Sequence, residues 1–325
     1  MNARPVHGGR LEEACAHFGG RPAEWLDLST GINPRPWPGA ESIRPDWRAL
    51  PDPQALARLE TAASDYFGGD QTLCCAVPGS EAGLRALGRV LDLPAQVTPL
   101  TYGTYAQAFA QPETGNLQPS VRIVANPNNP DGALLSREAL IAALGRQERE
   151  QGWLIVDEAF ADCHPGASVA GHVANGRRLI VTRSFGKFFG LAGVRLGFVI
   201  APKPLLSRLR ALQGDWPVCS AAIAFGCGAY ADARWIDQTR QALRTDAARL
   251  DGVLARHGLQ AMGESPLFRL VRTPDASHLF NALAQARILT RPFADYPDLI
   301  RFGLPASARH LARLDAALTD WSGRG

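Results

Sequence analysis

The feature that most constrains the fold is a series of short apolar runs, each followed by a polar or glycine-containing turn. They occupy residues 72–77, 121–125, 153–157, 179–182 and 196–201. Helical patterns follow several of them, and apolar strands that alternate with helices indicate a largely parallel sheet. In such sheets a ligand lies beyond the carboxyl ends of the strands. We therefore expect an α/β protein whose site is built from the turns that follow these runs.

The segments around this sheet predict two domains. A helix is expected over residues 53–67 with Asp52 as its N-cap, another begins at Ser136, and a long helical region covers about residues 220–257. The last part of the chain reads as strand, helix, strand, strand and helix over residues 267–271, 277–286, 289–293, 299–303 and 306–321. These patterns predict a large domain of residues 40–215, and a small α+β domain formed by residues 1–39 and 216–325.

Lys187 is the strongest candidate for chemistry. Lys and Arg together number 34, yet only Lys187 and Lys203 are lysines. Arg stays protonated at any usable pH, whereas a lysine that loses its proton can attack a carbonyl. Lys203 lies in a Pro-Lys-Pro segment, but Lys187 has Phe188, Phe189 and Leu191 as apolar neighbours, which favour the neutral amine. We interpret Lys187 as an amine that bonds to a carbonyl group; the alternative is an ordinary exposed lysine.

Two polar residues at other predicted strand ends suit pyridoxal phosphate. Asp157 ends a buried strand, and a carboxylate there can keep the pyridine nitrogen protonated, which turns the ring into an electron sink. A helix cap or a metal ligand are the alternatives for this residue. The Asn129 amide can donate to the ring oxygen, although Asn-Pro and Asp-Gly also form ordinary turns.

A phosphate cradle is predicted from two further segments. Gly79, Ser80 and Glu81 open a helix, whose free amides and positive dipole end suit a phosphate. Ser184 and Arg195 flank the lysine at short spacing and would add a hydroxyl and a fixed positive charge. By itself a Pro-Gly-Ser turn is weak support for a phosphate site, and the flanking residues strengthen it.

Four more side chains are candidates for contacts with the cofactor or the substrate. Tyr102 follows a strand-like run and can stack on the pyridine ring; Tyr105 is its rival, and core packing is the alternative for both. Arg301 lies on a predicted strand and can hold a carboxylate with its two-pronged guanidinium group. Arg291 can meet a second anion. Surface charge is the alternative for each arginine.

Composition argues against several classes of protein. The net charge of +3 is spread over single arginines, which gives no reason to expect nucleic acid. No stretch reaches the roughly 20 apolar residues that span a bilayer, and the N-terminus lacks the apolar core of a signal peptide. The six cysteines show neither metal-ligand nor disulfide spacing, which fits thiols in a reducing cytosol. We expect a cytoplasmic enzyme without a metal, a membrane or a nucleic-acid partner.

Together these motifs make the chain resemble the fold-type I pyridoxal phosphate enzymes of the class I/II aminotransferase family. The pattern S-x-x-K-x-x-x-x-x-G-x-R-x-G at residues 184–197 resembles the lysine segment of that family, and residues 129–132 and 157–159 resemble its ring-contacting segments. The resemblance covers nearly the whole chain. It implies a three-layer αβα fold with a mostly parallel sheet and a small α+β domain, pyridoxal 5'-phosphate as cofactor, and a homodimer.

Two subgroups of the family compete. One decarboxylates L-threonine O-3-phosphate to (R)-1-amino-2-propanol O-2-phosphate in cobalamin biosynthesis; the other comprises histidinol-phosphate-type aminotransferases that use 2-oxoglutarate. The segments 7–9 and 28–34 resemble the decarboxylases, as does Phe160, where the aminotransferases usually have tyrosine. Either way the substrate is a small phosphorylated amino compound. Leu50 departs from the family, which often has there a tyrosine that reaches the phosphate of the neighbouring subunit.

The resemblance to the decarboxylases also implies which residues lie near the substrate. They are His7, Gly8 and Asn33, with His7 and Arg291 facing the substrate phosphate. Two rivals from other classes are a cofactor-binding regulator, expected to carry a DNA-binding domain ahead of residue 7, and an α/β nucleotide enzyme, expected to have a denser glycine-rich loop after the first strand. Neither feature is found in this sequence.

Overall fold

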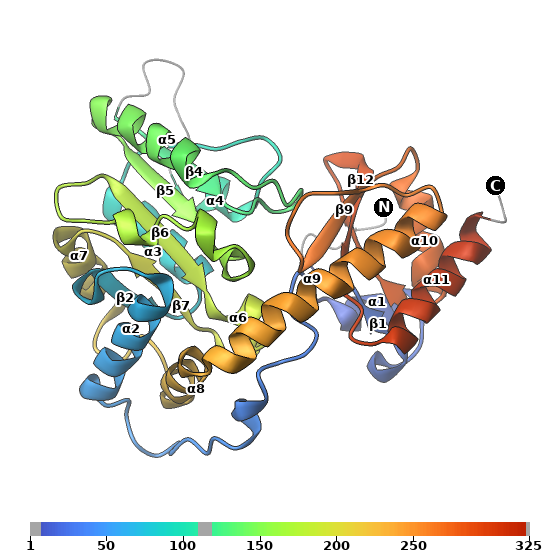
Figure 1. Ribbon diagram of the computed structural model, residues 1–325, viewed down its shortest axis with the longest axis horizontal. Helices are drawn as coiled ribbons and strands as arrows, with labels where there is room; N and C mark the ends of the chain where they lie inside the picture. Colours follow the sequence, from blue (N-terminus) through green and yellow to red (C-terminus); the bar gives the residue numbers. More distant parts are fainter. Residues whose placement is uncertain (1–7, 110–118, 323–325) are drawn as a thin grey trace. The chain divides into compact units, whose positions relative to one another are not determined.

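The computed structural model describes residues 8–109 and 119–322 (Figure 1). Contacts divide the chain into two compact units. The first, here called the terminal unit, consists of Met1–Arg35, Pro130–Gly132 and Gln238–Gly325. The second, here called the sheet unit, consists of Pro36–Asn129 and Ala133–Asp237. Among the residues described, no helix combines the length and the apolar character that a membrane span needs.

The sheet unit is built on a six-stranded sheet with the strand order β2-β7-β6-β5-β4-β3. Its strands are β2 (Cys74–Val77), β3 (Ala95–Gln96), β4 (Val121–Ala125), β5 (Trp153–Asp157), β6 (Leu179–Ser184) and β7 (Gly197–Ile200). Strands β3 to β6 pair in parallel, and β7 runs antiparallel to both of its neighbours. The predicted mostly parallel α/β sheet is therefore confirmed.

Helices cover both faces of this sheet. They are α2 (Pro53–Phe67), α3 (Ser80–Leu91), α4 (Thr104–Ala108), α5 (Arg137–Arg149), α6 (Phe185–Phe188), α7 (Lys203–Gln213) and α8 (Ser220–Ala231). On β7, Val199 belongs to one core cluster with Leu87 of α3 and Leu206 of α7. The preceding residue points to the other face, because side chains alternate along a strand; Phe198 there meets the rings of Phe67 in α2 and Tyr230 in α8. The unit therefore has three layers.

Two helices of the sheet unit begin where the sequence places their caps. The Asp52 side chain accepts a hydrogen bond from the Ala55 amide at 2.8 Å at the start of α2. The Ser136 hydroxyl accepts one from the Ala139 amide at 3.2 Å at the start of α5. Each cap satisfies one of the amides that have no partner within the first turn.

The terminal unit combines an antiparallel sheet with segments from both parts of the chain. The sheet has the order β11-β12-β9-β8, formed by Arg291–Phe293, Tyr296–Gly303, Phe268–Arg272 and Ala261–Met262. The helices of the unit are α1 (Leu11–Phe18), α10 (Ala276–Gln285) and α11 (Ala308–Ser322), together with most of α9 (Ala233–Arg256). The N-terminal segment joins this unit through β1 (Leu26–Asp27), which pairs in parallel with β10 (Ile288–Leu289).

The boundary between the units differs from the predicted one. The helical region that the sequence reads as continuous is divided at Asp232, whose carboxylate accepts hydrogen bonds from the Trp235 amide and from Trp37 Nε1. Helix α8 packs on α2, and a Cβ at Gly226 would collide with Leu59. Because of this packing, residues 216–237 belong to the sheet unit, whereas the prediction placed them in the small domain.

Candidate active site

The polar motifs of the sheet unit follow the carboxyl ends of strands that run in the same direction. Gly79 comes after β2, Asn129 after β4, Asp157 ends β5, and Lys187 comes after β6. Strand β2 is antiparallel to β7, and β7 is antiparallel to β6, so β2 runs with the parallel strands. The topology therefore brings these predicted site residues to one edge of the sheet, where α/β proteins bind ligands.

Lys187 lies on the single-turn helix α6, directly after β6. Its neighbours Phe185 and Phe188 are fully buried and anchor the turn, while Lys187 itself is half-buried. Its Nζ lies 5.9 Å from the centre of the Phe160 ring. Burial raises the pKa of the Asp157 carboxyl, and the charge of Lys187 opposes that rise, so the amine and the carboxylate belong to one electrostatic site.

Asp157 is a buried carboxylate with three hydrogen-bond donors. The Tyr105 hydroxyl donates to Oδ2 at 2.6 Å, and the Thr182 hydroxyl and the Ala159 amide donate to Oδ1 at 2.9 and 3.2 Å. Burial raises the pKa of Asp157, and the bonds from Tyr105 and Thr182 and the charge of Lys187 act in the opposite direction. The contacts therefore favour the charged form of a carboxyl group that burial alone would neutralise.

The structure separates the roles of the two tyrosines. The Tyr105 ring is fully buried and its hydroxyl bonds to Asp157, so it has no free face for stacking. Tyr102 is half-buried and meets the Tyr105 ring edge-on, with 5.6 Å between ring centres. Tyr102 thus remains the candidate for stacking. The sequence missed the role of Tyr105, and also that of Thr182, which pairs with Asp157 in the register of β5 and β6.

The first turn of α3 is open toward an arginine. The N-cap is Gly79, which has no side chain to accept from the first amides and has a φ of +94°. A Cβ there would lie 2.7 Å from Arg195 Nη2. A Cβ at Gly197 would lie 2.4 Å from the amide nitrogen of Ser80 and would collide with it. Backbone amides and a guanidinium group therefore converge in a space that larger residues would fill, which fits a phosphate.

Two predicted members of the cradle have more limited roles in the structure. The Glu81 carboxylate forms an ion pair with Arg85 at 3.1 Å, four residues along the same helix. What Glu81 offers an anion is therefore its backbone amide. Ser184 is the last residue of β6 and directly precedes α6, without capping that helix.

The loop after β4 is held against the segment that carries Tyr102. The Asn128 side-chain amide donates to the Leu100 carbonyl at 2.9 Å, and its oxygen accepts from the Thr101 hydroxyl at 3.0 Å. Asn129, the predicted partner of the ring oxygen, comes next and is half-buried. The asparagine-rich loop therefore positions two candidate residues, Asn129 and Tyr102, through one pair of bonds.

The terminal unit holds a second cluster, built around two arginines. Arg291 on β11 pairs with Arg301 on β12 in the antiparallel register. Arg301 is 3% exposed, donates to the Ser29 carbonyl at 2.8 Å, and lies 5.1 Å above the Phe268 ring. Burial and the charge of Arg291 lower the pKa of Arg301 to about 9. An anion beside both arginines would stabilise the buried charge of Arg301, which fits a substrate-binding role.

The other predicted substrate contacts lie in the same unit. Asn33 is buried, and its side-chain oxygen accepts from the Arg35 amide at 3.0 Å. Gly8 packs on Ser29, whose carbonyl also bonds to Arg301, and a Cβ at Gly8 would collide with that carbonyl. His7 lies outside the described residues. Gly8, Asn33 and the two arginines are therefore all in the terminal unit.

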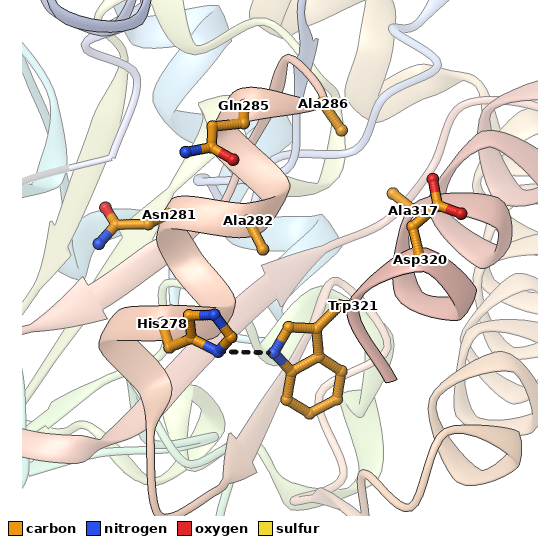
Figure 2. Close-up of a pocket in the computed structure, with 8 residues that line it drawn as sticks. All are labelled: His278, Asn281, Ala282, Gln285, Ala286, Ala317, Asp320 and Trp321. Carbon is orange, nitrogen blue, oxygen red and sulfur yellow. Dashed lines mark hydrogen bonds between the residues drawn. The ribbon is translucent and has the colours of Figure 1, made fainter. Parts of the chain in front are cut away.

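A separate pocket of about 310 Å³ lies between α10 and α11 of the terminal unit (Figure 2). It is lined by His278, Asn281, Ala282, Gln285, Ala286, Ala317, Asp320 and Trp321. Trp321 Nε1 donates to His278 Nδ1 at 3.3 Å, between two residues of this lining. The lining contains no lysine and none of the predicted site residues, so this pocket is not the candidate active site.

Comparison with known proteins identifies related sequences. The family model described as aminotransferase class I and II matches residues 100–313. A threonine-phosphate decarboxylase from Sinorhizobium sp is 40% identical over 98% of each chain, and one from Pseudomonas aeruginosa is 40% identical over 96% of each. Histidinol-phosphate aminotransferase 1 of Cupriavidus pinatubonensis is 28% identical over 96% of this chain and 79% of the relative.

Solved structures share the fold at low sequence identity. A histidinol-phosphate aminotransferase from Sinorhizobium meliloti, in complex with pyridoxal-5'-phosphate, has a TM-score of 0.84 and 18% identity, covering 97% of this chain and 94% of that one. L-Threonine-O-3-phosphate decarboxylase from Porphyromonas gingivalis has a TM-score of 0.77 and 18% identity, covering 91% and 99%. These neighbours confirm the predicted fold class. From the family match and the near full-length relatives, the chain belongs to the class I and II aminotransferase family.

Proposed function

We propose that this chain is a pyridoxal phosphate-dependent decarboxylase that converts L-threonine O-3-phosphate to (R)-1-amino-2-propanol O-2-phosphate in cobalamin biosynthesis. The observation that carries the proposal is the 40% identity, over 98% of both chains, with a threonine-phosphate decarboxylase. The histidinol-phosphate aminotransferases are more distant at 28–30%. We further propose that the enzyme acts in the cytoplasm as a homodimer.

The sheet unit fits the cofactor in charge and shape. The open first turn of α3 and the Arg195 guanidinium match a phosphate group. A side chain at Gly79 would be strained by the positive φ and would meet Arg195 Nη2. The buried Asp157 carboxylate matches a protonated ring nitrogen. We assign Asn129 to the ring oxygen, Tyr102 to the ring face and Ser184 to the phosphate. When bound, the cofactor supplies an electron sink for the pair released at the substrate Cα.

Lys187 and Asp157 perform the chemical work of the protein. Lys187 would hold the cofactor through its amine, and the same amine would return a proton to the substrate Cα. The Asp157 carboxylate would hold a proton on the cofactor's ring nitrogen, and the ring would then stabilise the electron pair from the broken bond. The Cα–carboxylate bond breaks, carbon dioxide leaves, and the new Cα–H bond completes the balance.

The residues of the terminal unit would bind the anionic groups of the substrate. Arg301 binds the carboxylate, and Arg291, with His7, binds the phosphate, while Gly8 and Asn33 line the remainder of the substrate site. With the cofactor bound, the substrate bond that these residues direct toward its electron sink would be the one that breaks. Holding the carboxylate in that direction gives decarboxylation, whereas holding Cα–H there gives transamination. The conformation imposed by Arg301 therefore decides the reaction.

The proposed homodimer includes no phosphate contact from position 50. Leu50 is 67% exposed and has no hydroxyl with which to reach a phosphate. Trp47, three residues earlier, is 73% exposed. This exposed apolar segment is consistent with burial against a second copy of the chain.

The proposal is tested with purified holoenzyme and L-threonine O-3-phosphate. We expect carbon dioxide and the amino alcohol phosphate in equal amounts, without any keto acid acceptor. The Lys187→Ala variant serves as the control and should release none. Turnover of histidinol phosphate that depends on 2-oxoglutarate, with no carbon dioxide from threonine phosphate, would assign the chain to the aminotransferases instead.

A further inference from the structure

The contacts of Asp157 come from three segments of the chain, and together they hold both oxygens of the carboxylate. Tyr105 of α4 bonds to Oδ2. Thr182 of β6 bonds to Oδ1, which also accepts from the Ala159 amide after β5. Since both oxygens are held, the plane of the carboxylate is fixed as well as its position.

These contacts offset the free-energy cost of burying an ionised carboxyl group. Asp157 is 5% exposed, and an ionised carboxyl group at such a site is unfavourable unless it is hydrogen-bonded or paired. Hydroxyl donors reduce that cost because they bond more strongly to the charged form than to the neutral one. Burial and the charge of Asp157 also raise the pKa of Tyr105 well above its usual value, so its phenol remains a neutral donor.

We propose that Tyr105 and Thr182 are positioning residues that keep the Asp157 carboxylate ionised and oriented for the cofactor ring nitrogen. This inference rests on the proposed function. Tyr105 also holds the ring of Tyr102, the candidate for stacking on the cofactor. Its amide bonds to the Tyr102 carbonyl at 3.1 Å, and the two rings meet edge-on. The short segment from Tyr102 to Tyr105 thus positions the stacking ring and also favours the charged form of the Asp157 carboxylate.

Few titratable groups act on Asp157 besides these donors. The charge of Lys187 opposes the rise that burial causes in the pKa of Asp157. The pKa of Tyr102 is raised by burial and, to a smaller extent, by the charges of Glu81 and Asp157. Glu158, the next residue, instead bonds to Arg183 and the Ser168 hydroxyl. Removing the Tyr105 or Thr182 hydroxyl should therefore change the ionisation of Asp157 with little compensation from neighbouring charges.

The test measures binding of pyridoxal 5'-phosphate to the apoenzyme between pH 5 and 8, by quenching of protein fluorescence and without substrate. Tyr105→Phe and Thr182→Val each remove one donor at nearly constant volume, and Thr182→Ser restores the hydroxyl. Each unit by which the pKa of Asp157 rises reduces its ionised fraction about tenfold at pH values below that pKa. We expect the dissociation constant of either variant to exceed that of the wild type at least tenfold at pH 5, and by less than about threefold at pH 8.

Two controls separate this role from a general packing defect. Thr182→Ser should follow the wild-type pH profile. Tyr230→Phe removes another buried phenol hydroxyl, from the aromatic cluster with Phe67 and Phe198, and should leave the profile unchanged. If Tyr105→Phe does not fold, Thr182→Val carries the test alone. Profiles parallel to the wild type in both variants would overturn the inference. Failure of the wild type to bind the cofactor at all would overturn the proposed function as well.

Discussion

Replacing Arg183 with methionine tests how the end of β6 is held beside the active site. Arg183 is buried and bonds to Glu158 Oε2 and Asp162 Oδ1, both at 2.8 Å. Burial would lower the pKa of Arg183, but the two carboxylates raise it above its usual value. Glu158 also accepts from the Ser168 hydroxyl and the Val169 amide, at 2.6 and 2.7 Å. This network ties the segment after β5 to the strand that leads into Lys187.

The substitution removes the cation that pairs with two buried acids, Glu158 and Asp162. Breaking a buried ion pair by removing one partner costs about 3–5 kcal/mol, because the remaining charge is left uncompensated. The Arg183 guanidinium carbon lies 4.3 Å from the centre of the Phe67 ring, and methionine keeps much of this packing. We therefore expect Arg183→Met to lower the free energy of unfolding at pH 7 by about 3–5 kcal/mol.

Urea unfolding of the apoprotein provides the assay, with two comparison variants. Adding Glu158→Gln and Asp162→Asn to Arg183→Met removes the uncompensated charges and should recover at least about half of the loss. Arg48→Met is the matched control, because Arg48 pairs with Asp46 at 3.5 Å on the surface, and it should cost about 0–1 kcal/mol. The reasoning is refuted if Arg183→Met costs no more than Arg48→Met, or if the triple variant is no more stable than the single one.

Three further predictions concern the phosphate site, the substrate site and a helix cap. Gly79→Ala should weaken binding of pyridoxal 5'-phosphate at least about tenfold, measured by apoenzyme titration, because it adds strain at positive φ and a Cβ 2.7 Å from Arg195 Nη2; unchanged affinity would remove Gly79 from the cradle. Arg301→Met should raise the KM for substrate at least about 30-fold. The pKa of Arg301 in the folded protein lies below its usual value, so its charged form lowers the stability of the fold at every pH below about 9. The apoprotein of this variant should therefore be as stable as the wild type or more stable at pH 7. A loss of stability would contradict the lowered pKa. Asp52→Ala should cost about 0.5–2 kcal/mol in thermal unfolding by leaving the Ala55 amide without its cap, and an unchanged melting temperature would contradict the capping role.

Local patterns in the sequence account for much of the fold. Strands β4 and β5 occupy the predicted residues, because their apolar runs end sharply at polar turns. The division between α8 and α9 was not predictable in the same way. Asp232 lies in a sequence without proline or glycine at that point, and its role depends on the indole of Trp37, far away in the chain.

The candidate site likewise contains residues that local sequence patterns predict and residues that they do not. Lys187 and Asp157 stand out because their chemistry is rare at apolar positions, and the strand order brings their segments together. The bond between Tyr105 and Asp157 spans 52 positions and joins α4 to β5, so no local pattern indicates it. Thr182 was predictable in principle, since parallel pairing of the two strands sets it opposite Asp157, but only once their register was known.

The most direct test of the account is the location of the covalent cofactor. Borohydride reduction of the holoprotein, followed by peptide mass spectrometry, should find one pyridoxyl group, on the peptide that contains Lys187. The Lys187→Ala protein should carry none and should lack the visible absorbance band. A modified Lys203, or a reduced wild-type protein without any adduct, would contradict the account.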